Sequence, residues 1–240
     1  MQTGRRLNLL FASSTQAEID NAYGLSKLAA EKSVQALATD IGCSVVLFRL
    51  PGVFGKWSRP QYNSVVATFC HTIAREIPIH VNDPSASLRL VYIDDVVDSF
   101  LDILTLSSPG ISNGLVQPEY IVTIGQLADQ IKAFNGCRGK GLQTERVGAG
   151  FVRALYATYL SFLPTKDFTY KVPKYQDPRG RFVEILKTPD SGQFSYFTAL
   201  PGITRGGHYH HTKSEKFVVM KGKALFRFRH LLTNELFEFN

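Results

Sequence analysis

A tyrosine and a lysine four positions apart, Tyr23 and Lys27, could act together at the start of an expected helix. Residues at this spacing lie on one helical face. A nearby ammonium favours the ionised form of a phenol, so such a pair could exchange a proton with a substrate. Ser14, nine residues before the tyrosine, could hydrogen-bond to the same substrate oxygen. The spacing is also common by chance, and the alternative interpretation is an exposed helix start with a solvated lysine.

A second candidate site lies near the C-terminal end, where His208, His210 and Glu215 stand between Gly202 and Gly222 in the spacing G-x5-H-x-H-x4-E-x6-G. Two histidines two apart face the same side of a strand. The glutamate follows a polar turn, so a hairpin could fold its carboxylate back beside both imidazoles. Two nitrogen ligands and one oxygen ligand suit zinc or another divalent metal. An isolated run of histidines is usually a surface feature, but the spaced glutamate and glycines favour a site.

The first half of the chain alternates apolar runs with a helical pattern. Residues 7–12 and 44–50 are typical of buried strands, and apolar residues recur at helical spacing over 25–41 before Gly42. Strand, helix and strand in succession predict a parallel sheet covered by helices. Further helices are expected at about 63–76, 94–106 and 124–135.

The second half has a different periodicity. Residues 136–180 are less regular and rich in glycine, and we expect them to hold a domain junction. Runs with period two follow at 182–186, 217–220 and 224–229, which predict an antiparallel barrel or sandwich. The fold class is therefore α/β followed by β, with one domain over 1–165 and a second over 166–240.

Composition narrows the range of partners. The 240 residues carry 27 Lys+Arg and 20 Asp+Glu, a formal charge of +7, and 44% are hydrophobic. No apolar run approaches the roughly 18 residues of a membrane span, and no secretory layout is present at the start. Three scattered cysteines predict no disulfide framework, so we expect a cytoplasmic protein.

The excess positive charge lies in 166–240, with 13 basic and 7 acidic residues. These basic residues alternate with Phe and Val instead of forming a block. A small anion such as a nucleotide sugar therefore fits at least as well as nucleic acid, and we expect neither a nucleic acid nor a membrane as partner.

The order of motifs in the first half resembles the second half of the extended short-chain dehydrogenases/reductases. The resemblance rests on the strand ending in Ser13-Ser14-Thr15, on Tyr23-x-x-x-Lys27, and on the strand that runs into Pro51-Gly52-Val53. It implies a Ser14, Tyr23 and Lys27 catalytic triad, with Thr15 as the alternative hydroxyl. It also implies that Tyr23 and Lys27 contact the cofactor, Lys27 at the nicotinamide ribose. The resemblance also implies that Pro51, Gly52 and Val53 line the nicotinamide pocket. It further implies that Asn63 and Arg89 contact the substrate phosphates.

The histidine motif is similar to the first motif of the cupin barrels, and the two halves together resemble the CapF-type capsular polysaccharide synthesis enzymes. That resemblance implies a bacterial, cytoplasmic homodimer that reduces C4 of a UDP-linked 4-keto-6-deoxy-N-acetylhexosamine with NADPH or NADH. It also implies cupin-catalysed C3 epimerisation on the route to UDP-N-acetyl-L-fucosamine. Zinc on His208, His210 and Glu215, with substrate contacts from Arg205 and Lys213, would serve the cupin half. A metal-free cupin epimerase that uses a histidine base remains an alternative.

The chain departs from the reductase pattern in one respect. The cofactor pyrophosphate needs a Gly-rich loop at a helix start, and no G-x-x-G-x-x-G occurs here. The resemblance therefore predicts an internal fragment of a longer enzyme, inactive alone, with an incomplete barrel. The other interpretations are a non-catalytic sugar-binding or dimerisation module, and an enzyme of the same architecture acting on a different nucleotide 4-keto sugar.

Overall fold

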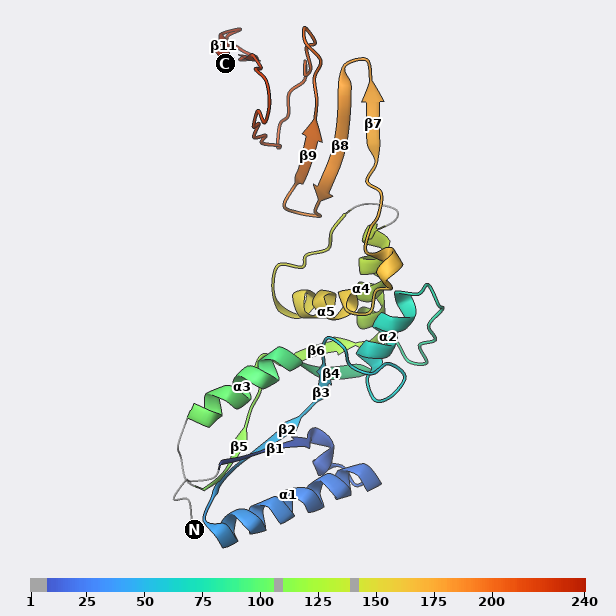
Figure 1. The fold of residues 1–240 in the computed structure, drawn as a ribbon, viewed down its shortest axis with the longest axis vertical. Coiled ribbons are helices and arrows are strands. Elements are labelled where there is room, and N and C mark those ends of the chain that lie inside the picture. Colours follow the sequence, from blue (N-terminus) through green and yellow to red (C-terminus); the bar gives the residue numbers. More distant parts are fainter. Residues whose placement is uncertain (1–7, 106–109, 139–142) are drawn as a thin grey trace. The chain divides into compact units, whose positions relative to one another are not determined.

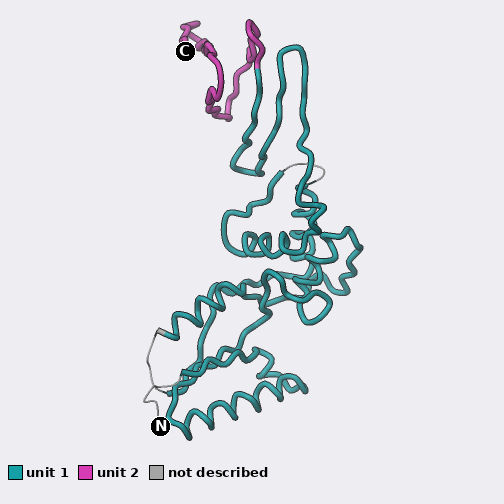
Figure 2. Tube along the Cα trace, in the orientation of Figure 1, with its two compact units in different colours: residues 1–198 teal, residues 199–240 magenta. Residues whose placement is uncertain are grey.

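The computed structural model describes residues 8–105, 110–138 and 143–240. The chain divides into two compact units, one up to Thr198 and one over Ala199–Asn240 (Figure 2). The expected strand start at Leu7 lies outside the described residues. The domain boundary expected between 165 and 166 stays a prediction.

A parallel three-stranded sheet with the order β1-β2-β5 forms the first layer of the larger unit (Figure 1). Its strands are β1 (Asn8–Ser14), β2 (Ser44–Leu50) and β5 (Ile111–Gly114), and helix α1 (Ala22–Ile41) connects the first two. The β1–β2 ladder is parallel throughout, with Ser13 opposite Arg49. The predicted strand–helix–strand unit is therefore confirmed.

Alternation along the strands places helices on both faces of this sheet. Leu9 and Phe11 of β1 pack with Val45 and Leu47 of β2 against the side chain of Ala38 on α1. The intervening strand residues, Leu10, Val46 and Phe48, face the other way. They join a cluster with three residues of helix α3 (Ile93–Thr105), which are Val96, Phe100 and Ile103. Because both faces are buried, the strands have continuous apolar sequences instead of alternating ones.

A second, mixed sheet has the order β3-β4-β6, from β3 (Gly52–Phe54), β4 (Ser87–Tyr92) and β6 (Tyr120–Thr123). Strands β3 and β4 pair in parallel, and β6 is antiparallel to β4. Strand β3 continues β2 after Pro51, whose ring removes a ladder donor and interrupts the strand. The helices α2 (Val65–Ile73) and α4 (Ile124–Gly136) pack here, as the sequence predicts.

Helix α5 (Gly150–Leu160) was not predicted, because the surrounding glycines favour an irregular segment. Its side chains Leu155, Thr158 and Tyr159 are fully buried in the core that α2 and α4 share. The phenol of Tyr159 donates a hydrogen bond to Asn135 Oδ1 at 2.9 Å. Burial of one helical face therefore overrides the local glycine signal.

The period-two region forms antiparallel strands but no closed barrel within the part of the chain that the structure describes. Strands β7 (Lys174–Asp177), β8 (Gly180–Lys187) and β9 (Gln193–Phe197) make one sheet, and β10 (Phe226–Arg229) pairs with β11 (Leu236–Phe239). The strand predicted over 182–186 is confirmed inside β8. The strand predicted over 217–220 is wrong, because no described segment pairs with it.

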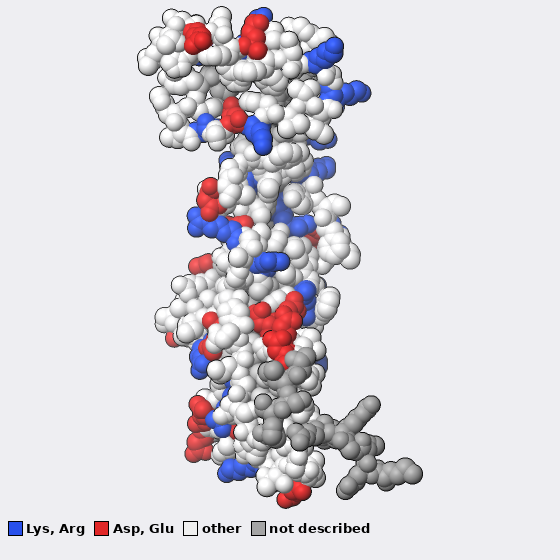
Figure 3. Space-filling model, turned by 90° about the vertical axis from the view of Figure 1, so that its left-hand side faces the viewer, with Lys and Arg blue, Asp and Glu red and all other residues white. Residues whose placement is uncertain are grey.

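Charges of both signs are interleaved on the face drawn in Figure 3, so the described residues present no continuous basic stripe there. Among the described helices, none has both the length and the apolar character needed to cross a bilayer.

Candidate functional sites

The first turns of α1 bring Tyr23 and Lys27 together. The Lys27 ammonium lies 5.7 Å from the centre of the Tyr23 ring. Tyr23 is 49% exposed as a residue, so it is not enclosed by the fold. The helix begins after Asn21, whose side chain accepts a hydrogen bond from the Gly24 N–H and satisfies an otherwise unpaired donor. The two side chains therefore lie next to each other, as their spacing on the helix predicts. Their catalytic roles stay predictions.

Ser14 lies at the carboxyl end of β1, where a short 3-10 helix, η1 (Thr15–Glu18), begins. Its Oγ accepts a hydrogen bond from the Gln16 N–H at 3.1 Å. A hydroxyl that accepts from a backbone amide can donate its own proton to another acceptor, such as a carbonyl oxygen. Thr15, the alternative hydroxyl, is the first residue of η1 and is partly buried.

Gly24 holds the start of α1 against η1. A Cβ atom at this position would lie 2.2 Å from the Gln16 carbonyl oxygen and 2.3 Å from that of Ile19. Both atoms belong to the backbone, so neither can turn away. The position next to Tyr23 therefore requires glycine, and this close approach sets the distance between the tyrosine turn and the segment that carries Ser14.

Gly24→Ala is expected to destabilise the chain by about 2 kcal/mol, because overpacking against fixed backbone forces the helix away from η1. Gly136→Ala is the matched control: Gly136 ends α4, and a Cβ atom there meets nothing within 4 Å. The control should be neutral or slightly stabilising, since alanine favours helix more than glycine does. Urea unfolding of both variants checks the difference; equal midpoints would contradict the packing argument.

A buried carboxylate on α1, Glu31, was missed by the sequence analysis. Its side chain is 2% exposed and lies 2.7 Å from Nη2 of Arg49. Ser13 Oγ donates to the same carboxylate at 2.5 Å. These hydrogen bonds, chiefly those from Arg49, hold the pKa of Glu31 below its ordinary value. The signal in the sequence was a glutamate four residues after Lys27, together with an arginine inside the apolar strand β2.

Of the residues expected around the cofactor and the substrate phosphates, three lie at the β2–β3 junction and one lies before α2. Gly52 pairs with Leu90, and Val53 packs in the cluster around Phe48. Pro51 is partly buried between β2 and β3. Asn63 is exposed, directly before the Ser64 cap of α2.

Arg89 of β4 points its guanidinium at the carboxylate of Glu119, with Nε and Nη2 each bonded to one oxygen. This contact lowers the pKa of Glu119. A phosphate would therefore have to replace this carboxylate, or share the guanidinium with it.

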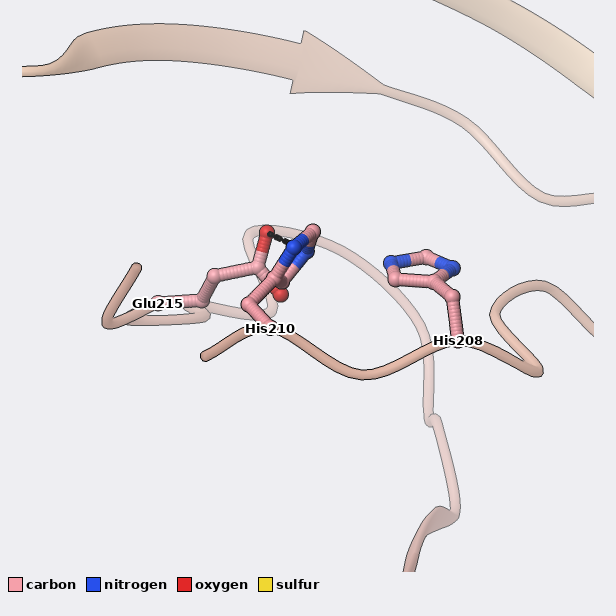
Figure 4. A group of neighbouring side chains, drawn as sticks. All are labelled: His208, His210 and Glu215. Atoms are coloured by element: carbon pink, nitrogen blue, oxygen red, sulfur yellow. Dashed lines mark ion pairs between the residues drawn. The ribbon is translucent and has the colours of Figure 1, made fainter. Parts of the chain in front are cut away.

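The second unit places the three predicted metal ligands together (Figure 4). One donor atom from each of His208, His210 and Glu215 lies within 4.8 Å of the others. Nε2 of His210 is 3.7 Å from Oε1 of Glu215, and the centres of the His208 and His210 rings are 5.0 Å apart. Donors bound to one zinc lie closer together, about 3–4 Å apart at bond lengths near 2.1 Å. A small rearrangement would therefore let this set hold a divalent metal.

Lys213 binds the same carboxylate, with Nζ 2.7 Å from Glu215 Oε1. This ammonium is the main cause that lowers the pKa of Glu215, and a metal bound there would have to share the carboxylate with Lys213 or displace it. Arg205 is partly buried in the same unit. An open hollow of about 320 Å³ adjoins the site, lined by Glu215, Lys216, Phe217, Phe226, Phe228 and Phe239.

Two family models match separate parts of the chain. Residues 11–116 match the NAD dependent epimerase/dehydratase family, and residues 175–240 match the polysaccharide biosynthesis C-terminal domain. The chain is 59% identical over 235 residues to a UDP-2-acetamido-2,6-beta-L-arabino-hexul-4-ose reductase from Pseudomonas aeruginosa. That match covers 98% of this chain and 63% of the relative.

Two solved structures carry the same similarity. The capsular polysaccharide assembling protein CapF from Staphylococcus aureus is 41% identical, with a TM-score of 0.88 over 99% of this chain and 66% of CapF. CapF with the inhibitor 3-isopropenyl-tropolone is 38% identical, with a TM-score of 0.81 over 98% of this chain and 65% of that one. The resemblance to the CapF-type capsular polysaccharide enzymes is thereby confirmed. The chain spans just under two thirds of the length of these relatives.

Proposed function

We propose that the chain acts, as part of a longer protein of the relatives' length, in the reduction of a nucleotide sugar for polysaccharide synthesis. The substrate is a UDP-linked 4-keto-6-deoxy-N-acetylhexosamine, and the ketone at C4 is reduced. The observation that carries this proposal is the Lys27 ammonium 5.7 Å from the ring of an exposed Tyr23. The 59% identity to a UDP-hexul-4-ose reductase supports the substrate class.

The residues of the chain supply the proton and the positioning. Tyr23 donates its phenolic proton to the C4 oxygen, and the ammonium of Lys27 stabilises the phenolate left behind. The Ser14 hydroxyl donates a hydrogen bond to the same oxygen. NADPH or NADH, held at Pro51, Gly52, Val53 and Lys27, supplies the hydride when bound. Thr15, Asn63 and Arg89 contact the substrate, with the guanidinium exchanging Glu119 for phosphate.

A second step, inversion at C3 of the same sugar, belongs in our proposal to the C-terminal half, which we infer to be the first part of a cupin barrel. The C4 ketone acidifies the proton on C3, so a base beside it can invert that centre. Lys213 and Arg205 place positive charge near the oxygens that become negative. A divalent metal on His208, His210 and Glu215, zinc in our proposal, would add Lewis acidity there. Tropolone inhibition of CapF supports a metal, because tropolones chelate divalent ions through two adjacent oxygens.

The remaining parts of the proposal follow from this chemistry. The product lies on the route to UDP-N-acetyl-L-fucosamine. The protein works in the bacterial cytoplasm as a homodimer, with a division between reductase and cupin at 165/166. Neither nucleic acid nor a membrane takes part.

The full-length protein that contains this chain tests the proposal. Incubated with the UDP-linked 4-keto sugar, it should consume NADPH, followed by absorbance, and yield a reduced, C3-inverted sugar by NMR. UDP-N-acetylglucosamine, which has no ketone, is the control and should give no consumption. Residues 1–240 alone should turn over nothing. Full-length protein that leaves the ketone intact, or a 1–240 chain that reduces it, would contradict the proposal.

A further inference from the structure

The helix that carries the tyrosine and the lysine has a third polar residue on the same stripe. Glu31 follows Lys27 by four residues, as Lys27 follows Tyr23. The stripe runs from the 49% exposed tyrosine to a carboxylate that is 2% exposed. A charged group so placed costs free energy unless it is paired, and its partners must therefore lie at fixed positions.

Those partners belong to the two strands behind the helix. Arg49 Nε and Nη2 donate to the carboxylate at 2.9 and 2.7 Å, and Ser13 Oγ donates at 2.5 Å. Ser13 and Arg49 are direct neighbours across the β1–β2 ladder. One carboxylate therefore connects the third turn of α1 to the carboxyl ends of both strands.

The same guanidinium also reaches the segment between β1 and α1. Nη1 of Arg49 lies 2.8 Å from Oε1 of Glu18, the last residue of η1. Arg49 thus connects a carboxylate at the end of η1 to a carboxylate on α1. The positions of Ser14 and of the Tyr23 turn are set by one network, in addition to the close approach at Gly24.

We propose that Glu31, through Arg49 and Ser13, is a positioning residue that aligns Tyr23 and Lys27 with the Ser14 hydroxyl. The proposal rests on the proposed reductase function. It assigns no contact between Glu31 and the substrate or cofactor. Displacement of a reacting group by about 1 Å can lower a rate by about a hundredfold, so loss of this anchor should appear in the rate of the chemical step.

The test uses Glu31→Gln in the full-length protein, assayed with the 4-keto sugar and NADPH at a temperature where the variant is folded by circular dichroism. We expect kcat to fall about tenfold or more, with the KM for the sugar and the Kd for NADPH within about twofold of the parent. Asp40→Asn, an exposed change at the other end of α1, is the matched control and should keep the parental kcat. A parental kcat in Glu31→Gln would overturn the inference.

A double variant separates alignment from stability. Glu31→Gln with Arg49→Gln removes both charges of the buried pair, and Glu18, which loses its contact with Arg49, is 70% exposed to water. No unpaired ion therefore stays buried, and the melting temperature should recover toward the parent. Two amides cannot reproduce the forked contact, and we expect kcat to stay low. Recovery of kcat together with the melting temperature would reduce the role of Glu31 to stability and overturn the inference. Tyr23→Phe, run beside these variants, identifies failure of the proposed function itself: parental activity in that variant would overturn both.

Discussion

Tyr23→Phe should lower kcat for reduction of the 4-keto sugar by about a thousandfold, since a positioned general acid contributes about 10² to 10⁴ in rate. The change removes one oxygen, and the ring can still pack as before. Tyr23 is 49% exposed, and the neighbouring ammonium of Lys27 lies 5.7 Å from its ring. Without the phenol, the C4 oxygen would have to take its proton from water or from the weaker acid Ser14, which in our proposal only hydrogen-bonds to it.

The measurement is steady-state NADPH consumption with the full-length protein, together with the melting temperature of each variant. Tyr62→Phe is the matched control, because Tyr62 is 70% exposed and its ring faces Arg59 instead of the α1 pair. The control should keep kcat within about twofold, as expected for a surface position. If Tyr23→Phe kept more than about a tenth of the parental kcat with the same melting temperature, another proton donor would be at work.

The β1–β2 pair of the first sheet could be predicted from sequence because burial on both faces leaves a simple pattern, whereas β5 (Ile111–Gly114) was not predicted. Continuous apolar strands on each side of a helix with a glycine stop determine a parallel pair, and β1, α1 and β2 follow it. Helix α5 could not be predicted in the same way. Its stability comes from Leu155 and Tyr159 packing on residues of distant helices, which no local window contains.

The two sites differ in how much the sequence reveals. The Tyr23–Lys27 pair depends on helical spacing alone, which sequence shows directly. The Glu31–Arg49 contact joins residues 18 apart through the packing of α1 on strand β2, so only the folded chain reveals it. The three candidate metal ligands lie together although the strand predicted after Glu215 is absent. The polar turn between the histidines and the glutamate is the segment that brings the glutamate back to them.

His208→Ala should weaken zinc binding by the full-length protein by about a hundredfold or more, because loss of outer-shell partners alone costs about 10- to 100-fold. A two-residue donor set of His210 and Glu215, 3.7 Å apart, would remain. The proposed C3 inversion should fall with the metal. It can be followed by NMR as deuterium uptake at C3 of the 4-keto sugar in heavy water, without NADPH, which separates it from reduction at C4.

The neighbouring histidine provides the control for that prediction. His211 lies beside Tyr209, with the two rings 5.1 Å apart, and contributes no donor to the group of three. His211→Ala should therefore keep both metal content and deuterium uptake. Equal metal loss in both alanine variants would point to general unfolding of the second unit. Deuterium uptake that persists in metal-free protein would instead assign the proton transfer to a histidine base that needs no metal.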